Sequence, residues 1–119
     1  MKLQKFYAVL STEDIDAAEA WYSKLLGRAP DFRPMNTMVQ WELSDQGGLA
    51  ISSDELIAST GALFLIVDDV EIERRRLDGL GIEIGDDLEG NYSTLAQVAD
   101  PDGNLITLAT PPSRPYPSA

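Results

Sequence analysis

Apolar and polar residues alternate along several short segments of the chain, a pattern typical of half-buried β-strands. In residues 38–43 the alternation separates an apolar face, with Val39 and Trp41, from a polar face, with Gln40 and Glu42. Successive side chains of a strand point to opposite faces of the sheet, so we expect Trp41 and Glu42 to point in opposite directions. Further strands are predicted over residues 3–10, 49–53 and 62–67, with two short strands meeting near residues 34–36.

Two other segments show the apolar spacing of amphipathic helices. The first follows Ser11, a predicted N-cap with Asp14 three residues later, and ends near Gly27. The second follows Asp69 and ends at Gly79. Its buried stripe is predicted to be Val70, Leu77 and Leu80, with Ile72 nearby.

A tight turn at residues 100–103, Asp-Pro-Asp-Gly, predicts a β-hairpin between strands over 92–99 and 104–109. Pro101 presets its own φ, and Gly103 supplies a positive φ without steric cost. A similar turn around Gly47 and Gly48 precedes an earlier strand. Residues 52–59 are predicted to be a linker, and residues 83–91 a loop.

These patterns repeat at about half the length of the chain, which indicates two copies of one supersecondary unit. Each copy reads as βαβββ, so the predicted fold class is α+β with two tandem modules. Module one covers residues 1–53 and module two residues 60–110, within one domain over 1–110. The Pro-rich tail, residues 111–119, is expected to be extended and poorly ordered.

Composition narrows the possible functions. The chain has no Cys and no His, which removes disulfides, thiolate ligands and the commonest metal-binding side chain. A net charge of −11 argues against nucleic acid and anionic membranes as partners, and it would suit a cationic ligand. No apolar run is long enough for a membrane span and no signal peptide is evident, so we expect a cytoplasmic protein.

Three stretches resemble motifs of the glyoxalase/bleomycin-resistance/extradiol dioxygenase superfamily, also called vicinal oxygen chelate proteins. They are the Trp-Tyr-Ser-Lys-Leu-Leu-Gly stretch at 21–27, Val-Asp-Asp-Val at 67–70, and residues 100–106 around the Asp-Pro-Asp-Gly turn. The resemblance implies two modules that form a curled mixed sheet around a pocket. It also implies a homodimer, whose pockets are often built from modules of both chains.

Metalloenzymes of this superfamily have four metal-ligand positions, which the resemblance places at Tyr7, Ile51, Ala62 and Thr107. Ile and Ala carry no donor atom, and Tyr and Thr are poor ligands for a divalent ion. The sequence therefore predicts no metal site and no cofactor. It leaves open whether the protein is an enzyme and favours one that is not a metalloenzyme.

Metal-free proteins that resemble this chain sequester drugs in aromatic, acidic pockets. Aromatic faces stack on planar groups and attract cations, and Met adapts to irregular ligands. On this basis we expect ligand contacts from Tyr7, Phe32, Met35, Trp41, Glu42, Ile51, Phe64, Tyr92 and Thr107.

The preferred function is a metal-independent small-molecule binding protein of the bleomycin-resistance type, with a cationic or aromatic ligand in a dimeric pocket. The alternative is a glyoxalase-like lyase or isomerase, or a dioxygenase, with a non-standard site. In that case Glu42 is the candidate base, because a desolvated carboxylate has a raised pKa. A third hypothesis is a degenerate family member that serves only as an interaction module.

Overall fold

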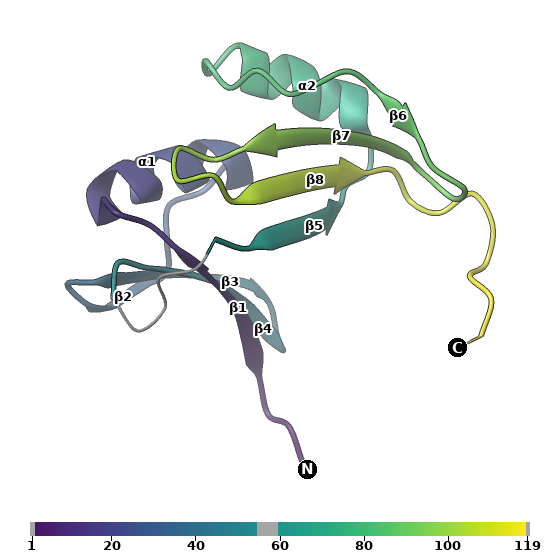
Figure 1. The fold of residues 1–119 in the computed structure, drawn as a ribbon. Coiled ribbons are helices and arrows are strands. Elements are labelled where there is room, and N and C mark those ends of the chain that lie inside the picture. The colour runs from purple at the N-terminus through teal and green to yellow at the C-terminus, as the bar shows by residue number, and fades with distance from the viewer. Residues whose placement is uncertain (1, 55–59, 119) are drawn as a thin grey trace. The chain divides into compact units, whose positions relative to one another are not determined.

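The chain folds into two four-stranded sheets, each with one helix, in a computed structural model that describes residues 2–54 and 60–118 (Figure 1). The order βαβββ occurs twice, so the α+β fold with two tandem modules is confirmed. The first module comprises β1 (Phe6–Ser11), α1 (Ile15–Leu26), β2 (Phe32–Met35), β3 (Met38–Ser44) and β4 (Gly47–Ser52). The second comprises β5 (Ala62–Ile66), α2 (Val70–Asp78), β6 (Leu88–Glu89), β7 (Thr94–Ala99) and β8 (Leu105–Ala109).

Both sheets have the same topology. In the first, β1 pairs with β4 in parallel and the other pairs are antiparallel, in the order β1-β4-β3-β2. In the second, β5 and β8 form the parallel pair, in the order β5-β8-β7-β6. A parallel pair needs a crossover connection, which the helix and the two intervening strands provide in each module.

The chain divides into two compact units, each made of two segments of the sequence. The first unit groups residues 1–61 with residues 100–104, and the second groups residues 62–99 with 105–119. The turn between β7 and β8 therefore belongs to the first unit, although the strands on either side of it belong to the second.

The core of the first unit lies between α1 and one face of its sheet. Four side chains on this face are at most 1% exposed: Val39, Trp41, Leu49 and Ile51. Tyr22 of α1 is fully buried, and its ring lies 6.2 Å from that of Trp41. The Trp41 indole N–H also donates to the carbonyl oxygen of Arg28 at 3.0 Å, which satisfies the polar atom of this core side chain.

The cap of α1 differs from the prediction. Ser11 is the last residue of β1, where it pairs with Ser52, and Asp14 is the N-cap. The Asp14 carboxylate accepts from the backbone N–H of Ala17 at 3.1 Å. The parallel pairing thus extends the strand past the predicted N-cap. Gly27 ends the helix in the left-handed conformation, with φ 72°, as predicted.

Helix α2 covers the second sheet with a narrower apolar stripe than predicted. Val70 and Leu77 are buried, but Ile72 is 62% exposed and Leu80 43% exposed. Ile72 lies about 200° around the helix from Val70, and Leu80 lies two residues beyond the end of the helix, so neither can join the stripe. Within residues 2–54 and 60–118, no helix is long and apolar enough to cross a membrane.

Two further predictions need correction or lie partly outside the structure. The segment 83–91 contains strand β6, in which Leu88 pairs with Leu95, so it is not entirely a loop. A two-residue strand is too short to produce an alternation in the sequence. The predicted linker 52–59 begins with Ser52 of β4, and its residues 55–59 lie outside the described residues.

The turn at residues 100–104 is held by a buried carboxylate. Asp100 is 6% exposed and accepts from the Tyr22 hydroxyl at 2.6 Å and from Asn104 Nδ2 at 2.7 Å. Its other oxygen accepts from the backbone N–H groups of Asp102, at 2.9 Å, and Asn104, at 2.8 Å. Gly103 has a φ of 88°, which confirms its predicted role in the turn.

The same turn also binds the end of β1. Asp102 accepts from the Thr12 hydroxyl at 2.6 Å and from the backbone N–H of Glu13 at 2.8 Å. Asn104 Nδ2 donates to the carbonyl oxygen of Ser11 at 2.8 Å. These contacts explain why the turn belongs to the first unit.

Candidate functional site

The face of the β1–β4 sheet that α1 does not cover is called the open face. Register places Tyr7 of β1 and Glu42 of β3 on this face, on either side of Gly48 in β4. Gln40 follows one step along β3, opposite Ala50. The open face therefore brings together a phenol, a carboxylate and an amide from two strands that are separated by β4.

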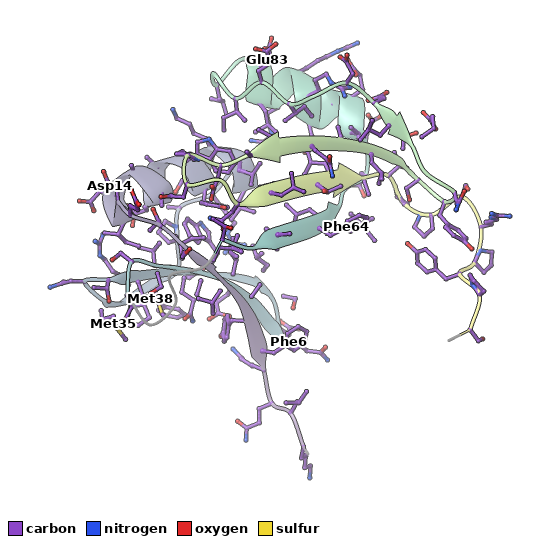
Figure 2. All side chains as sticks on the ribbon, in the orientation of Figure 1. Phe6, Asp14, Met35, Met38, Phe64 and Glu83 are labelled. Carbon is purple, nitrogen blue, oxygen red and sulfur yellow. The ribbon has the colours of Figure 1, made fainter. Side chains whose placement is uncertain are left out.

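Two apolar side chains of β2 extend the open face. Phe32 pairs with Gln40 and Met35 pairs with Met38, and the register shifts between the two pairs. This irregularity puts Phe32 and Met35 on the same face although they are three residues apart. They are 56% and 52% exposed, and Figure 2 shows Met35 and Met38 on the side of the sheet away from α1.

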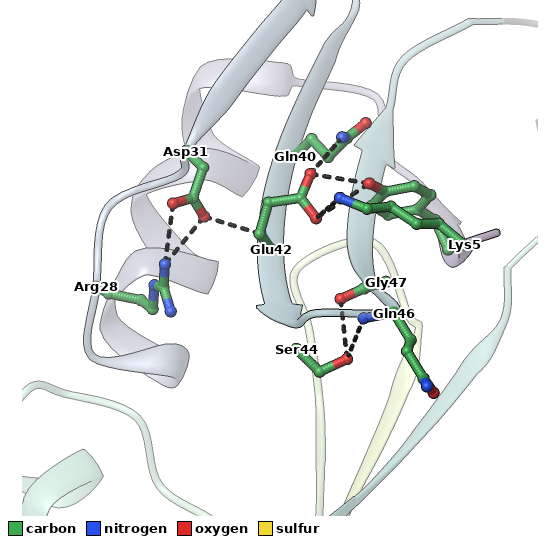
Figure 3. Close-up of polar contacts among 9 residues, drawn as sticks. Lys5, Arg28, Asp31, Gln40, Glu42, Ser44, Gln46 and Gly47 are labelled. Carbon is green, nitrogen blue, oxygen red and sulfur yellow. Dashed lines mark hydrogen bonds and ion pairs between the residues drawn. The ribbon is translucent and has the colours of Figure 1, made fainter.

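Tyr7 and Glu42 form the central contact of the open face. The Tyr7 hydroxyl donates to both carboxylate oxygens of Glu42, at 2.8 and 3.0 Å. Gln40 Nε2 donates to the same carboxylate at 3.1 Å, and Lys5 Nζ lies 3.9 Å from it (Figure 3). The Glu42 side chain is 21% exposed, so its carboxylate is partly shielded and held in place by neutral donors.

A second carboxylate fixes the backbone at Glu42. Asp31 Oδ2 accepts from the backbone N–H of Glu42 at 2.8 Å. Arg28, just after α1, donates to both oxygens of Asp31 at 3.0 Å, as Figure 3 shows. Neither Asp31 nor Arg28 is among the site residues predicted from the sequence. The contact between Arg28 and Asp31 is local in the sequence. The contact of Asp31 with Glu42 depends on where β3 lies, which no local sequence pattern indicates.

The Glu42 carboxylate raises the pKa of Tyr7 above its ordinary value, mainly because the phenol donates a hydrogen bond that its ionised form would lose. We expect Tyr7 to ionise above its ordinary pKa of about 10. Any contribution of this pair to stability is then full below that pH and lost as pH rises through the raised pKa.

Glu42→Gln should return the Tyr7 transition toward the ordinary value in an ultraviolet phenolate titration. A Tyr7→Phe chain identifies the transition, and an unchanged titration in Glu42→Gln would contradict the assignment.

The structure does not place Trp41 and Ile51 with Tyr7 and Glu42. Both are core side chains beneath α1, 0% and 1% exposed, on the face opposite the open face. By register, Thr107 faces Gln97 and Phe64 in the second sheet, and Ala50 has the equivalent place in the first sheet. The predicted position at Ile51 is therefore displaced by one residue, which moves a side chain to the other face.

In the second unit, Phe64 and Thr107 lie side by side on one face of the sheet, as Figure 2 indicates for Phe64 on β5. Phe64 is 57% exposed, whereas Thr107 is 7% exposed and accepts from Gln97 Nε2 at 3.1 Å. Tyr92 precedes β7, and its ring contacts Tyr116 of the tail. For these three residues, ligand contact stays a prediction.

The residues at the metal-ligand positions do not fit a divalent ion. The Tyr7 phenol is protonated and donates to Glu42, and the Thr107 hydroxyl accepts from Gln97. Ala62 and Ala50, which takes the place predicted for Ile51, carry no donor atom. Among the described residues, no group of three or more Asp or Glu side chains could hold a metal ion.

A polar cavity of about 540 Å³ lies within the first unit, at the ends of β1 and β4. None of the residues predicted from the sequence to contact a ligand lines this cavity. Hydroxyl and carboxylate groups dominate its lining, which consists of Ser11, Thr12, Glu13, Ser53, Asp54, Thr60, Pro101 and Asp102. The bonds of Thr12 and Glu13 to Asp102 show that part of this lining holds the turn at residues 100–104.

Comparison with known proteins relates this arrangement to one superfamily. The sequence of residues 6–108 matches the family model of the glyoxalase/bleomycin resistance protein/dioxygenase superfamily. A glyoxalase/bleomycin resistance protein from Catenulispora acidiphila DSM 44928 is 30% identical, with 93% of this chain and 100% of that chain covered and a TM-score of 0.79. No curated protein sequence matches the chain.

Two other similar structures are named for bleomycin. The bleomycin resistance determinant encoded on the transposon Tn5 is 25% identical, with 90% of this chain and 97% of that chain covered and a TM-score of 0.72. A bleomycin-binding protein complexed with bleomycin is 24% identical, with 92% and 98% covered and a TM-score of 0.70, which relates the folds. At the level of the family, the comparisons support a small-molecule binding protein.

Proposed function

The chain belongs to the glyoxalase/bleomycin resistance protein/dioxygenase superfamily, and we propose that it binds a cationic or aromatic small molecule on the open face of the first unit. This is a metal-independent function of the bleomycin-resistance type. The residues proposed to contact the ligand are Tyr7, Phe32, Met35, Gln40 and Glu42. Trp41 and Ile51 are left out, because they lie in the core.

The Tyr7–Glu42 pair is the observation that carries the proposal. A partly shielded carboxylate favours a cation more than an exposed one does, because less water screens the charge. Lys5 lies 3.9 Å from Glu42 and has a side chain 51% exposed, so a ligand cation can replace it. Phe32 and Met35 add exposed apolar surface beside the carboxylate, which suits an aromatic part of the same ligand.

Bleomycin gives its name to two of the similar structures. We expect it to bind the purified chain in a calorimetric titration. Glu42→Gln should weaken binding by about 10- to 100-fold, because a hydrogen bond to a charged group contributes about 1.5–3 kcal/mol. Affinity should fall as salt rises and should not change when a chelator is added.

Glu83→Gln is the matched control, since it removes one exposed acidic charge from the second unit. If bleomycin does not bind, a panel of aromatic cations tests whether the ligand is another member of the class. Failure of the whole panel would refute the proposed function. Equal losses in Glu42→Gln and Glu83→Gln would refute the open face as the site.

We further propose that the protein is a cytoplasmic homodimer whose ligand sites depend on the assembly. Phe6, at 68% exposure, and Phe64, at 57%, lie on the edge strands β1 and β5, where unpaired backbone groups and apolar side chains favour association. Light scattering should give twice the mass of one chain. A monomeric mass at the concentrations used for ligand binding would contradict the assembly.

A further inference from the structure

The C-terminal segment of the second unit covers the ring of Tyr92. The guanidinium carbon of Arg114 lies 4.8 Å from the centre of this ring, within the range of a cation–π contact. The ring of Tyr116 lies 5.0 Å away, inclined by 59°. A cation and an aromatic ring from the chain itself therefore share one aromatic surface.

The cover is anchored on one side only. The backbone N–H of Ser113 donates to the carbonyl oxygen of Tyr92 at 2.8 Å, and that of Thr110 donates to Thr94 at 3.0 Å. After Ser113, residues 114–118 are exposed, and Tyr116 retains 57% of its accessible surface. Among the described residues, no ion pair of Arg114 with a carboxylate is found. The contact with Tyr92 is thus a surface contact that another group can replace.

A small cleft adjoins the covered ring. Its volume is about 170 Å³, and its lining consists of Glu89, Gly90, Tyr92, Ser93, Thr94, Thr110, Pro111 and Ser113. Glu89 contributes a carboxylate, which accepts from the Thr94 hydroxyl at 3.3 Å. A cation placed on the Tyr92 ring would therefore lie near a negative charge that Arg114 does not use in an ion pair.

We propose that Tyr92 and this cleft form a second binding site, for a planar cation with an aromatic part, and that residues 114–118 occupy it as an internal competitor. Such a ligand combines in one molecule the two groups that Arg114 and Tyr116 now supply separately. The prolines at 115 and 117 restrict the free segment, which lowers the entropy it loses on covering the ring. The site uses residues of the second unit alone, so it is independent of the function proposed for the open face.

Benzamidine, a planar aromatic cation, is the probe, and its binding is followed through its own resonances in an NMR titration, so that the measurement does not depend on Tyr92. A chain ending at Ser113 keeps the anchoring bond and removes the cover. It should bind benzamidine about tenfold more tightly than the full chain. A segment that occupies the site lowers the apparent affinity in proportion to the fraction of molecules whose site is free. Tyr92→Leu in the shortened chain should abolish binding, and benzamide, which carries no charge, should not bind.

If the shortened chain fails to fold, the full chain with Arg114→Gln and Tyr116→Ser gives the same comparison. Equal affinity of covered and uncovered chains would overturn the competition, and binding that survives Tyr92→Leu would overturn the site. A loss of bleomycin binding on the open face has no bearing on either result.

Discussion

Replacing Asp100 with alanine is expected to destabilise the first unit by about 3–5 kcal/mol, because each buried donor left without an acceptor costs about 1–3 kcal/mol. The change leaves four donors without their acceptor: the Tyr22 hydroxyl, the Asn104 amide and two backbone N–H groups of the turn. Burial and the Asp100 carboxylate raise the pKa of Tyr22 far above its ordinary range, so this hydroxyl remains a donor over the whole range of pH at which the protein would be studied.

The free energy of unfolding in denaturant measures this effect. Asp45→Ala is the matched control, since it removes the same charge from an exposed turn and should change stability by less than about 0.5 kcal/mol. Tyr22→Phe removes one bond of the network, and the double variant with Asp100→Ala should be less destabilised than the sum of the two single variants. A loss in Asp100→Ala no larger than in Asp45→Ala would show that the turn does not depend on this carboxylate.

Gly48→Ala is expected to destabilise the first unit by about 2–4 kcal/mol and to separate Tyr7 from Glu42. A Cβ at Gly48 would overlap the carbonyl oxygen of Trp41 and lie 3.0 Å from the backbone nitrogen of Leu43. These are backbone atoms of β3, so β3 and β4 would have to move apart where the register is irregular. Glu42 pairs with Gly48 and would move with β3.

Two measurements separate these consequences. Denaturation gives the stability loss, and the phenolate titration of Tyr7 should shift toward its ordinary pKa, as in Glu42→Gln. Gly79→Ala is the matched control, because Gly79 is in the right-handed helical region and a Cβ there meets only atoms at 3.5 Å or more. If Gly48→Ala were as stable as Gly79→Ala, the close approach of β4 to β3 at this glycine would be wrong.

Sequence patterns determined which residues share a face of β3 but not which face would be covered. Alternation separated Trp41 from Glu42, and the structure agrees. Both faces of this strand contain side chains able to form a pocket or a core. The Trp41 face is the buried one because α1 packs on it, with Tyr22 against Trp41. This contact between two distant segments cannot be predicted from the pattern of β3 alone.

The repeat located the modules, yet a spacing that is wrong by one residue is enough to misplace a side chain. Thr107 corresponds to Ala50, not to Ile51, and in a strand this difference exchanges the two faces. The Tyr7–Glu42 contact was beyond prediction for a related reason. It depends on β4 lying between β1 and β3, and strand order cannot be derived from the hydrophobic pattern of each strand.

Asn104 donates to the carbonyl oxygen of Ser11 across 93 positions of the chain, and this has a consequence for synthesis. A growing chain leaves the ribosome from its N-terminus at about 5–20 residues per second, and N-terminal parts usually fold first. Here the N-terminal unit cannot acquire its last hydrogen bonds until residue 104 has emerged. By then β5, α2, β6 and β7 have already been made. The second unit still lacks β8 at that point, so the unit that is translated first is completed only shortly before the other, and both units mature in the same late interval.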